Sequence, residues 1–248
     1  MKRLVLVLAT VFALPVAPSF ADVTVTMAVS INAGPMVMTT TSVTWIKGMK
    51  ARTDASVMQQ DTSVFLDLAS KQMLMANHST TTIADPQSMM ANLPMSFGEI
   101  TLSFEPSGQT KEILGRTCGG YKVSMSIPMT IGEESVTMKG TGMVWLAKDG
   151  PGVEEFKALN KAAAAAGLST GGMNMGPQAK GMLELQKAMA ERGVMFEQEI
   201  QMTMEGTGQM AQAMGQMGNM STSMKVTAIT TDPIPDDKFV LPAGYTKQ

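Results

Sequence analysis

This 248-residue sequence is poor in the side chains that act at catalytic and metal sites. It has one cysteine and one histidine, and charged residues make up only 16% of the chain. A zinc site of the usual kind needs several cysteine and histidine ligands, so the composition disfavours one. His78 lies in an expected turn, with no Gly-x-Ser-x-Gly nucleophile turn nearby. We therefore interpret His78 as a solvated turn residue, and we expect no enzymatic activity and no cofactor.

The single cysteine, Cys118, excludes an internal disulfide. A chain of this size buries about 70–75% of its unfolded surface and needs no such bond to fold. Because unpaired cysteine most often packs as a small hydrophobe, we expect Cys118 to be buried. A catalytic Cys118–His78 pair would require the two residues to meet in space, which the sequence alone leaves open.

Long apolar runs and basic clusters are also lacking. The apolar run Leu4–Ala13 is shorter than the ~20 residues of a membrane span. It follows Lys2 and Arg3 and precedes Ser19–Ala21, which is the order of a secretory signal peptide. We expect cleavage after residue 21, a periplasmic or secreted protein with one domain over residues 22–248, and no stable membrane insertion.

The balance of charge argues against a nucleic-acid partner. The chain has 19 basic and 21 acidic residues, and the lysines are scattered singly. Binding to nucleic acid needs several cations gathered on one face to neutralise phosphates. We expect no nucleic-acid partner, and the sequence identifies no protein partner.

Alternating apolar and polar residues dominate the chain from Asp22 to Thr141, and this period of two predicts strands. Gly140 and Gly142 suggest a bulge or bend. Helical patterns follow at Val153–Ala166 and Pro177–Arg192, inside an insertion over residues 153–193. Strand patterns then return. We predict an α+β, mainly β fold: a strongly curved antiparallel sheet with the helical insertion covering one face.

One apolar hairpin, within residues 61–85, is central to this prediction. Its expected strands are Ser63–Leu68 and Gln72–Ala76, the second continuing into Thr80–Ile83. Met73 and Met75 share one face by alternation. We interpret the hairpin as part of a cavity wall, without deciding which of its faces is turned inward.

Methionine is the abundant residue, with 27 copies. Several form Met-x-Met pairs, and more lie in a Met/Gln/Gly-rich loop over residues 206–220. Methionine can serve as an adaptable apolar lining. Its thioether is also a soft ligand that suits Cu(I). Both interpretations stay open, and apolar lining is favoured for the strand methionines.

Three stretches resemble a known family. They are SVFLDLASKQMLMANHSTTTI (63–83), KEILGRTCGGYKVSMS with the later GMVWLAKD, and the ending IPDDKFVLPAGYTK. They are similar to the DUF4412 group of exported bacterial proteins, which is related to the LolA/LolB lipoprotein-carrier superfamily. The matching positions in the second stretch are Ile113, Gly115, Cys118, Tyr121, Val123, Val144, Trp145 and Ala147. The helical insertion and the Met/Gln/Gly-rich loop depart from the family pattern.

The resemblance implies an antiparallel half-barrel whose concave apolar face is covered by helices and can take acyl chains. We therefore expect a non-enzymatic binding protein for a lipid or another apolar small molecule. The expected cavity-lining residues are Phe65, Met73, Met75, Met125, Met202 and Met204. The alternative is a periplasmic Cu(I)-binding protein whose ligands come from Met173, Met175, Met210, Met214 and Met217.

Overall fold

A computed structural model of the protein describes residues 21–34, 36–57, 60–85, 95–166, 168 and 187–247. Strands predominate in these ranges, and they form one 13-stranded sheet. In chain order they are β1 (Val23–Ala33), β2 (Met36–Lys47), β3 (Lys50–Val57), β4 (Gln60–Asp67), β5 (Gln72–Asn77), β6 (Thr82–Ala84), β7 (Met95–Phe97), β8 (Thr101–Ile113), β9 (Arg116–Ile131), β10 (Glu134–Ala147), β11 (Val194–Gly206), β12 (Met220–Thr230) and β13 (Thr246–Lys247).

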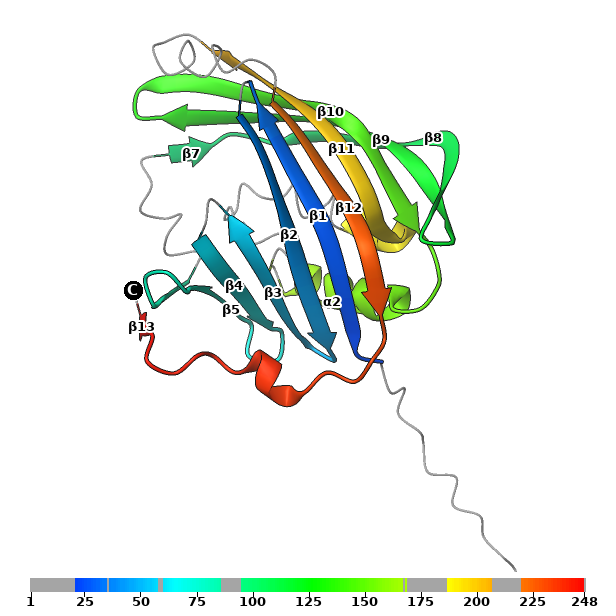
Figure 1. Ribbon diagram of the computed structural model, residues 1–248. Coiled ribbons are helices and arrows are strands. Elements are labelled where there is room, and N and C mark those ends of the chain that lie inside the picture. The colour runs from blue at the N-terminus through cyan, green and yellow to red at the C-terminus, as the bar shows by residue number, and fades with distance from the viewer. Residues whose placement is uncertain are drawn as a thin grey trace, which may run out of the picture.

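The sheet is a long, open and strongly curved surface (Figure 1). Its strand order is β13-β6-β5-β4-β3-β2-β1-β12-β11-β10-β9-β7, and β8 also pairs with β9. Every pairing is antiparallel except that of β6 with β13. The first long strand, β1, therefore pairs with the last long strand, β12. The strands β2–β6 form an antiparallel meander on one side of this pair, and β9–β11 form another on the other side. This confirms the predicted mainly β, curved antiparallel half-barrel.

Irregular pairings help the sheet to curve, because bulges bend and twist a strand. The register shifts between Thr26 and Met27 on β1, and between Trp145 and Leu146 on β10. A bulge or a bend was expected at Gly140 and Gly142; there is no bulge, since pairing with β11 is continuous there. Gly142 instead permits a close approach: a Cβ at this position would lie 2.0 Å from the carbonyl oxygen of Glu199.

Helix α2 (Val153–Ala165) packs on the sheet and forms the main core with it. Val153, Leu159 and Ala163 of the helix are buried in one cluster with apolar residues of the sheet. The sheet residues include Val23 and Val25 on β1, and also Ile46, Leu66 and Met73. We call the sheet face that carries Val23 and Val25 the inner face, and the opposite one the outer face. A helix thus covers part of the inner face, as predicted.

The predicted hairpin is present as β4 and β5, with one correction. The Asp67 carboxylate accepts hydrogen bonds from the backbone N–H groups of Ala69 (2.9 Å) and Ser70 (3.3 Å), which fixes the turn. The second strand does not continue to Ile83. It ends at Asn77, and a turn containing Thr81 at φ 51° folds the chain back, so that β6 pairs with β5.

Residues 231–247, here called the C-terminal strap, run along the outer face of β2–β5. They contain a short 3-10 helix, η2 (Asp236–Phe239). The Lys47 ammonium lies 2.7 Å from the Asp236 carboxylate, and Arg52 Nη1 donates to the Lys238 carbonyl oxygen at 3.1 Å. The Lys238 ammonium lies 4.8 Å from the centre of the Trp45 ring. The strap is therefore attached by several polar contacts.

Two other predicted segments fall largely outside the described residues. Of the second expected helix, only residues 187–192 are described, and they are helical. Residues 1–20 of the expected signal peptide and residues 207–219 of the Met/Gln/Gly-rich loop lie outside the description. Within the described ranges, no helix has the length and hydropathy that a membrane crossing requires.

Candidate functional site

The inner face can be followed across the sheet, because directly paired residues project to the same side. Three successive rows of pairs run from β8 or β9 to β2. The first is Leu102, Met125, Gly140, Met202, Met220, Ala33 and Met36; the second is Phe104, Val123, Gly142, Ile200, Thr222, Ile31 and Met38; the third is Tyr121, Val144, Gln198, Met224, Val29 and Thr40. None of these residues is charged, so this part of the inner face is an uncharged, mostly apolar surface.

The same strands carry a different chemistry on the outer face. Most residues that alternate with the three rows are polar or charged, and the exposed ones include Lys122, Lys139, Thr141, Glu199, Gln201, Thr203 and Glu205. This division is the one expected of a sheet with one wet face and one protected face. The inner face is therefore the side of the sheet suited to an apolar ligand.

Methionines concentrate on the inner face. Among the strand methionines with described side chains, Met143 alone projects outward. Six of the inner methionines lie together on β9–β12 and are neither fully buried nor exposed. We call these six the methionine surface: Met125, Met138, Met202, Met204, Met220 and Met224. Side chains in this state can move to fit a guest with little loss of core packing.

The structure separates the predicted lining residues into groups. Met125, Met202 and Met204 come together on the methionine surface. Met73 is buried in the core cluster formed with α2, and Met75 lies on the same face, partly buried. These five residues thus share the inner face. That any of them contacts a ligand stays a prediction.

Phe65 lies on the outer face. It pairs with Leu74, whereas its neighbour Leu66 pairs with Met73 on the inner face. The Phe65 ring packs in a small cluster with Ala76 and Ile83. Adjacent residues of a strand point to opposite faces, so Phe65 and Met73 cannot line one cavity. The alternation of residues alone does not show whether Phe65 or Met73 points toward the inner side of the sheet.

The methionines of the Cu(I) alternative, Met173, Met175, Met210, Met214 and Met217, lie outside the described residues. In the part of the chain that the structure describes, no group of three or more His, Cys, Asp or Glu side chains is placed to hold a metal ion. The thioethers of the methionine surface are a different set of soft donors.

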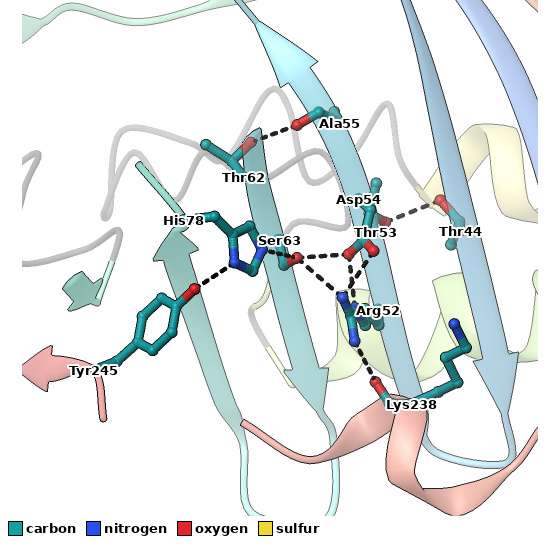
Figure 2. A network of polar contacts seen from close by, with 10 residues as sticks. All are labelled: Thr44, Arg52, Thr53, Asp54, Ala55, Thr62, Ser63, His78, Lys238 and Tyr245. Carbon is teal, nitrogen blue, oxygen red and sulfur yellow. Dashed lines mark hydrogen bonds and ion pairs between the residues drawn. The ribbon is translucent and has the colours of Figure 1, made fainter. Parts of the chain in front are cut away.

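The one histidine belongs to a polar network on the outer face (Figure 2). The Tyr245 hydroxyl lies 2.5 Å from Nδ1 of His78, and Nε2 of His78 lies 2.7 Å from Oγ of Ser63. Ser63 Oγ in turn lies 2.6 Å from Oδ1 of Asp54. Arg52 donates to both Asp54 carboxylate oxygens, at 2.6 and 2.8 Å. His78 lies in a turn, as predicted, but both of its ring nitrogens have protein partners, so its interpretation as a solvated residue was wrong.

One arrangement of protons satisfies every hydrogen-bonding group from Tyr245 through His78 and Ser63 to Asp54. The Tyr245 hydroxyl donates to Nδ1, the Nε2–H group donates to Ser63 Oγ, and the Ser63 hydroxyl donates to Asp54. In a catalytic triad the histidine stands between the serine and the acid, whereas here the serine stands between the histidine and the acid. Ser63 is also fully buried at 0% exposure. The network is suited to fixing the C-terminal strap on β3–β5 and poorly suited to nucleophilic attack.

Two grooves elsewhere on the described surface are lined by polar and charged residues together with apolar ones. One of about 380 Å³ adjoins the network and is lined by Thr41, Asp61, Thr62 and network residues. Another, of about 770 Å³, is lined by residues that include Arg116, Lys148 and Asp149. Neither groove is lined by residues of the three uncharged rows of the inner face.

Cys118 is fully buried in the core cluster with α2, which confirms the predicted burial. Its Sγ lies 3.7 Å from the carbonyl oxygen of Arg116. Desolvation by burial, aided by the Glu112 carboxylate, raises the pKa of the thiol. Since His78 is bonded to Ser63 and Tyr245, the structure does not bring the two residues together as a Cys–His pair.

Neither the protein-family models nor the curated proteins include a match to this chain. Among solved structures, the chain is similar to a LolA superfamily protein from Nitrosomonas europaea, with 6% identity and a TM-score of 0.30 over 91% of this chain and 92% of that one. It is also similar to PNGF-II, with 11% identity and a TM-score of 0.35 over 91% of this chain. It spans 31% of the PNGF-II chain. Membership of the DUF4412 group stays a prediction, because no family model matches.

Proposed function

We propose that this chain is an exported, non-enzymatic binding protein that shelters the acyl chain of a lipid or fatty acid on its inner face. One observation carries the proposal. The three rows across β8–β12, β1 and β2 hold no charged residue, and they carry partly buried methionines on an open, curved sheet. A charged or strongly polar ligand would find no ion-pair partner on these rows.

The energetics favour an acyl chain as the occupant. Each buried methylene group contributes about 0.8 kcal/mol, so eight of them contribute roughly 6 kcal/mol before the cost of ordering the chain. Methionine has three rotatable bonds and a polarizable sulfur, which allows the wall to adapt to a flexible guest. The rows extend across neighbouring strands, as an elongated guest requires.

Export is part of the proposal. Residues 1–21 carry the order of charge, apolar run and small residues typical of a signal peptide. A lipid that moves through an aqueous compartment needs a protein to cover its acyl chain. An exported protein with an uncharged inner face is suited to this task.

Native mass spectrometry tests the proposal on protein purified from its own compartment without detergent. We expect a bound species whose mass matches a lipid or fatty acid, released by organic extraction, and renewed binding when the lipid is returned. A chain that carries no lipid, is equally stable after extraction and takes up no fluorescent fatty acid would contradict it.

A further inference from the structure

Four residues of the methionine surface stand at positions around Gly140, which has no side chain. Gly140 pairs with Met125 on β9 and with Met202 on β11, so that a methionine stands on either side of it. Met138 is the preceding residue of β10 on the same face, and it pairs with Met204. Four methionines from three adjacent strands therefore surround a position that has no side chain.

The Met125 side chain lies over Gly140. A Cβ at Gly140 would lie 2.8 Å from Cγ and 3.2 Å from Sδ of Met125, and 3.4 Å from Cγ2 of Ile200. Strands are 4.7–4.9 Å apart, so the backbones that carry Met125 and Met202 are separated by roughly 9.4–9.8 Å. The Met125 side chain extends over part of this distance. The missing side chain at Gly140 makes the convergence possible.

The surroundings favour a soft, singly charged ion. Met125, Met138 and Met204 pack against the buried residues Ile127 and Val136. Thioethers are soft, neutral donors that select Cu(I) over the harder divalent cations, which prefer oxygen ligands. No carboxylate lies in the rows that hold the four methionines, so the site offers nothing to balance a second positive charge. All four side chains are partly exposed, which leaves an entry path.

We propose that Met125, Met138, Met202 and Met204 form a binding site for Cu(I), centred over Gly140. The site goes beyond the proposed lipid function. Its ligands also differ from the methionines of the Cu(I) alternative that the sequence suggests, which lie within residues 173–175 and 210–217. It requires three of the four thioethers to turn toward the ion, and the flexibility of methionine permits this.

The test is an anaerobic competition titration of full-length protein with Cu(I) and a colorimetric Cu(I) chelator. The variant Met125→Leu/Met138→Leu/Met202→Leu keeps the apolar surface and removes three donors. The matched control Met27→Leu/Met38→Leu/Met224→Leu removes three inner-face methionines away from Gly140. Methionines elsewhere contribute equally to wild type and both variants.

We expect the first variant to lose one Cu(I) equivalent, with at least a hundredfold weaker binding at that site, while the control keeps it. Titration curves that match wild type, or an equal loss in the control, would overturn the proposal. If the triple variant fails to fold, Met125→Leu alone decides: we expect about tenfold weaker binding, and unchanged binding refutes the site. Because leucine preserves acyl-chain binding, loss of metal binding does not test the lipid function.

Discussion

At the scale of single residues, Ser63 shows how a buried hydroxyl joins distant elements. It accepts from His78 on the turn after β5 and donates to Asp54 on β3, and His78 in turn holds Tyr245 of the strap. Removing the hydroxyl takes one hydrogen bond from His78 and one from Asp54. In Ser63→Ala we expect the free energy of unfolding to fall by about 1–3 kcal/mol, measured by urea denaturation.

The control for this change is Ser124→Ala, on the exposed outer face of β9. We expect it to alter stability by no more than about 0.5 kcal/mol. Equal effects of the two substitutions would show that the network contributes nothing to holding the fold.

The buried thiol of Cys118 gives a second prediction at this scale. Its pKa is raised by burial, so the reactive thiolate is scarce in the folded protein. We expect a disulfide reagent to modify native protein at pH 8 only as fast as the chain unfolds, and to modify it at once in guanidinium. Rapid reaction of the native thiol would contradict the burial.

The contacts of the polar network differ in how far they can be predicted from the sequence. The strands β3 and β4 are consecutive in the chain, and the antiparallel register that pairs Val57 with Gln60 also pairs Asp54 with Ser63. A short separation in sequence of this kind is a local signal for that contact. Tyr245 follows His78 by 167 residues and reaches it only through the strap. No local pattern encodes that contact. The histidine was therefore misinterpreted because its partners lie far apart in the chain.

At the scale of elements, β10 carries two glycines with different neighbours. A Cβ on Gly142 would meet the Glu199 backbone oxygen at 2.0 Å, whereas on Gly140 it would meet the flexible Met125 side chain. We expect Gly142→Ala to lower stability by about 3 kcal/mol and Gly140→Ala by about 1 kcal/mol or less, measured by thermal and urea unfolding. A reversed order would show that β10 and β11 are not in this close contact.

The strap gives a prediction for pH. The Lys47 ammonium lowers the pKa of Asp236, so the pair stabilises the fold above the ordinary carboxyl pKa of 3.8, and this contribution is lost as the pH falls through the lowered value. Asp236 chiefly raises the pKa of Lys47, so nothing is lost on the alkaline side until the pH exceeds the ordinary lysine value of 10.5.

We therefore expect Asp236→Asn to be less stable than wild type near pH 7 and equal to it near pH 2. Because both groups are exposed, the effect is small, and urea midpoints measured side by side are the suitable comparison. A difference that persists unchanged in acid would assign the effect to another cause.

The alternation of apolar and polar residues predicts the strands but not the way in which they pair. The strands around Val23, Met73 and Met125 follow from alternating residues, and each Met-x-Met pair shares a face. Whether the methionine faces of different strands lie on the same side of the sheet depends on the register of every strand pairing. The sequence of a single strand does not determine that register. The methionine surface therefore appears only when β9–β12 are assembled.

At the scale of the whole molecule, the two faces of the sheet differ in chemistry, and the proposed function rests on this difference. Met202 and Thr203 are neighbours on β11 and project to opposite faces. Met202→Lys places a charge in the uncharged rows, and Thr203→Lys adds the same charge to the exposed outer face. The two variants have the same net charge and are altered in the same strand, so a difference in ligand binding between them reports on the face of the sheet alone.

The most direct measurement is a titration of a fluorescent fatty acid into wild type, Met202→Lys and Thr203→Lys. We predict that Met202→Lys weakens binding about tenfold or more, because the acyl chain must then lie against a charge, while Thr203→Lys binds like wild type. Equal affinity in all three proteins, or no binding by wild type, would contradict the inner face as a lipid-binding surface.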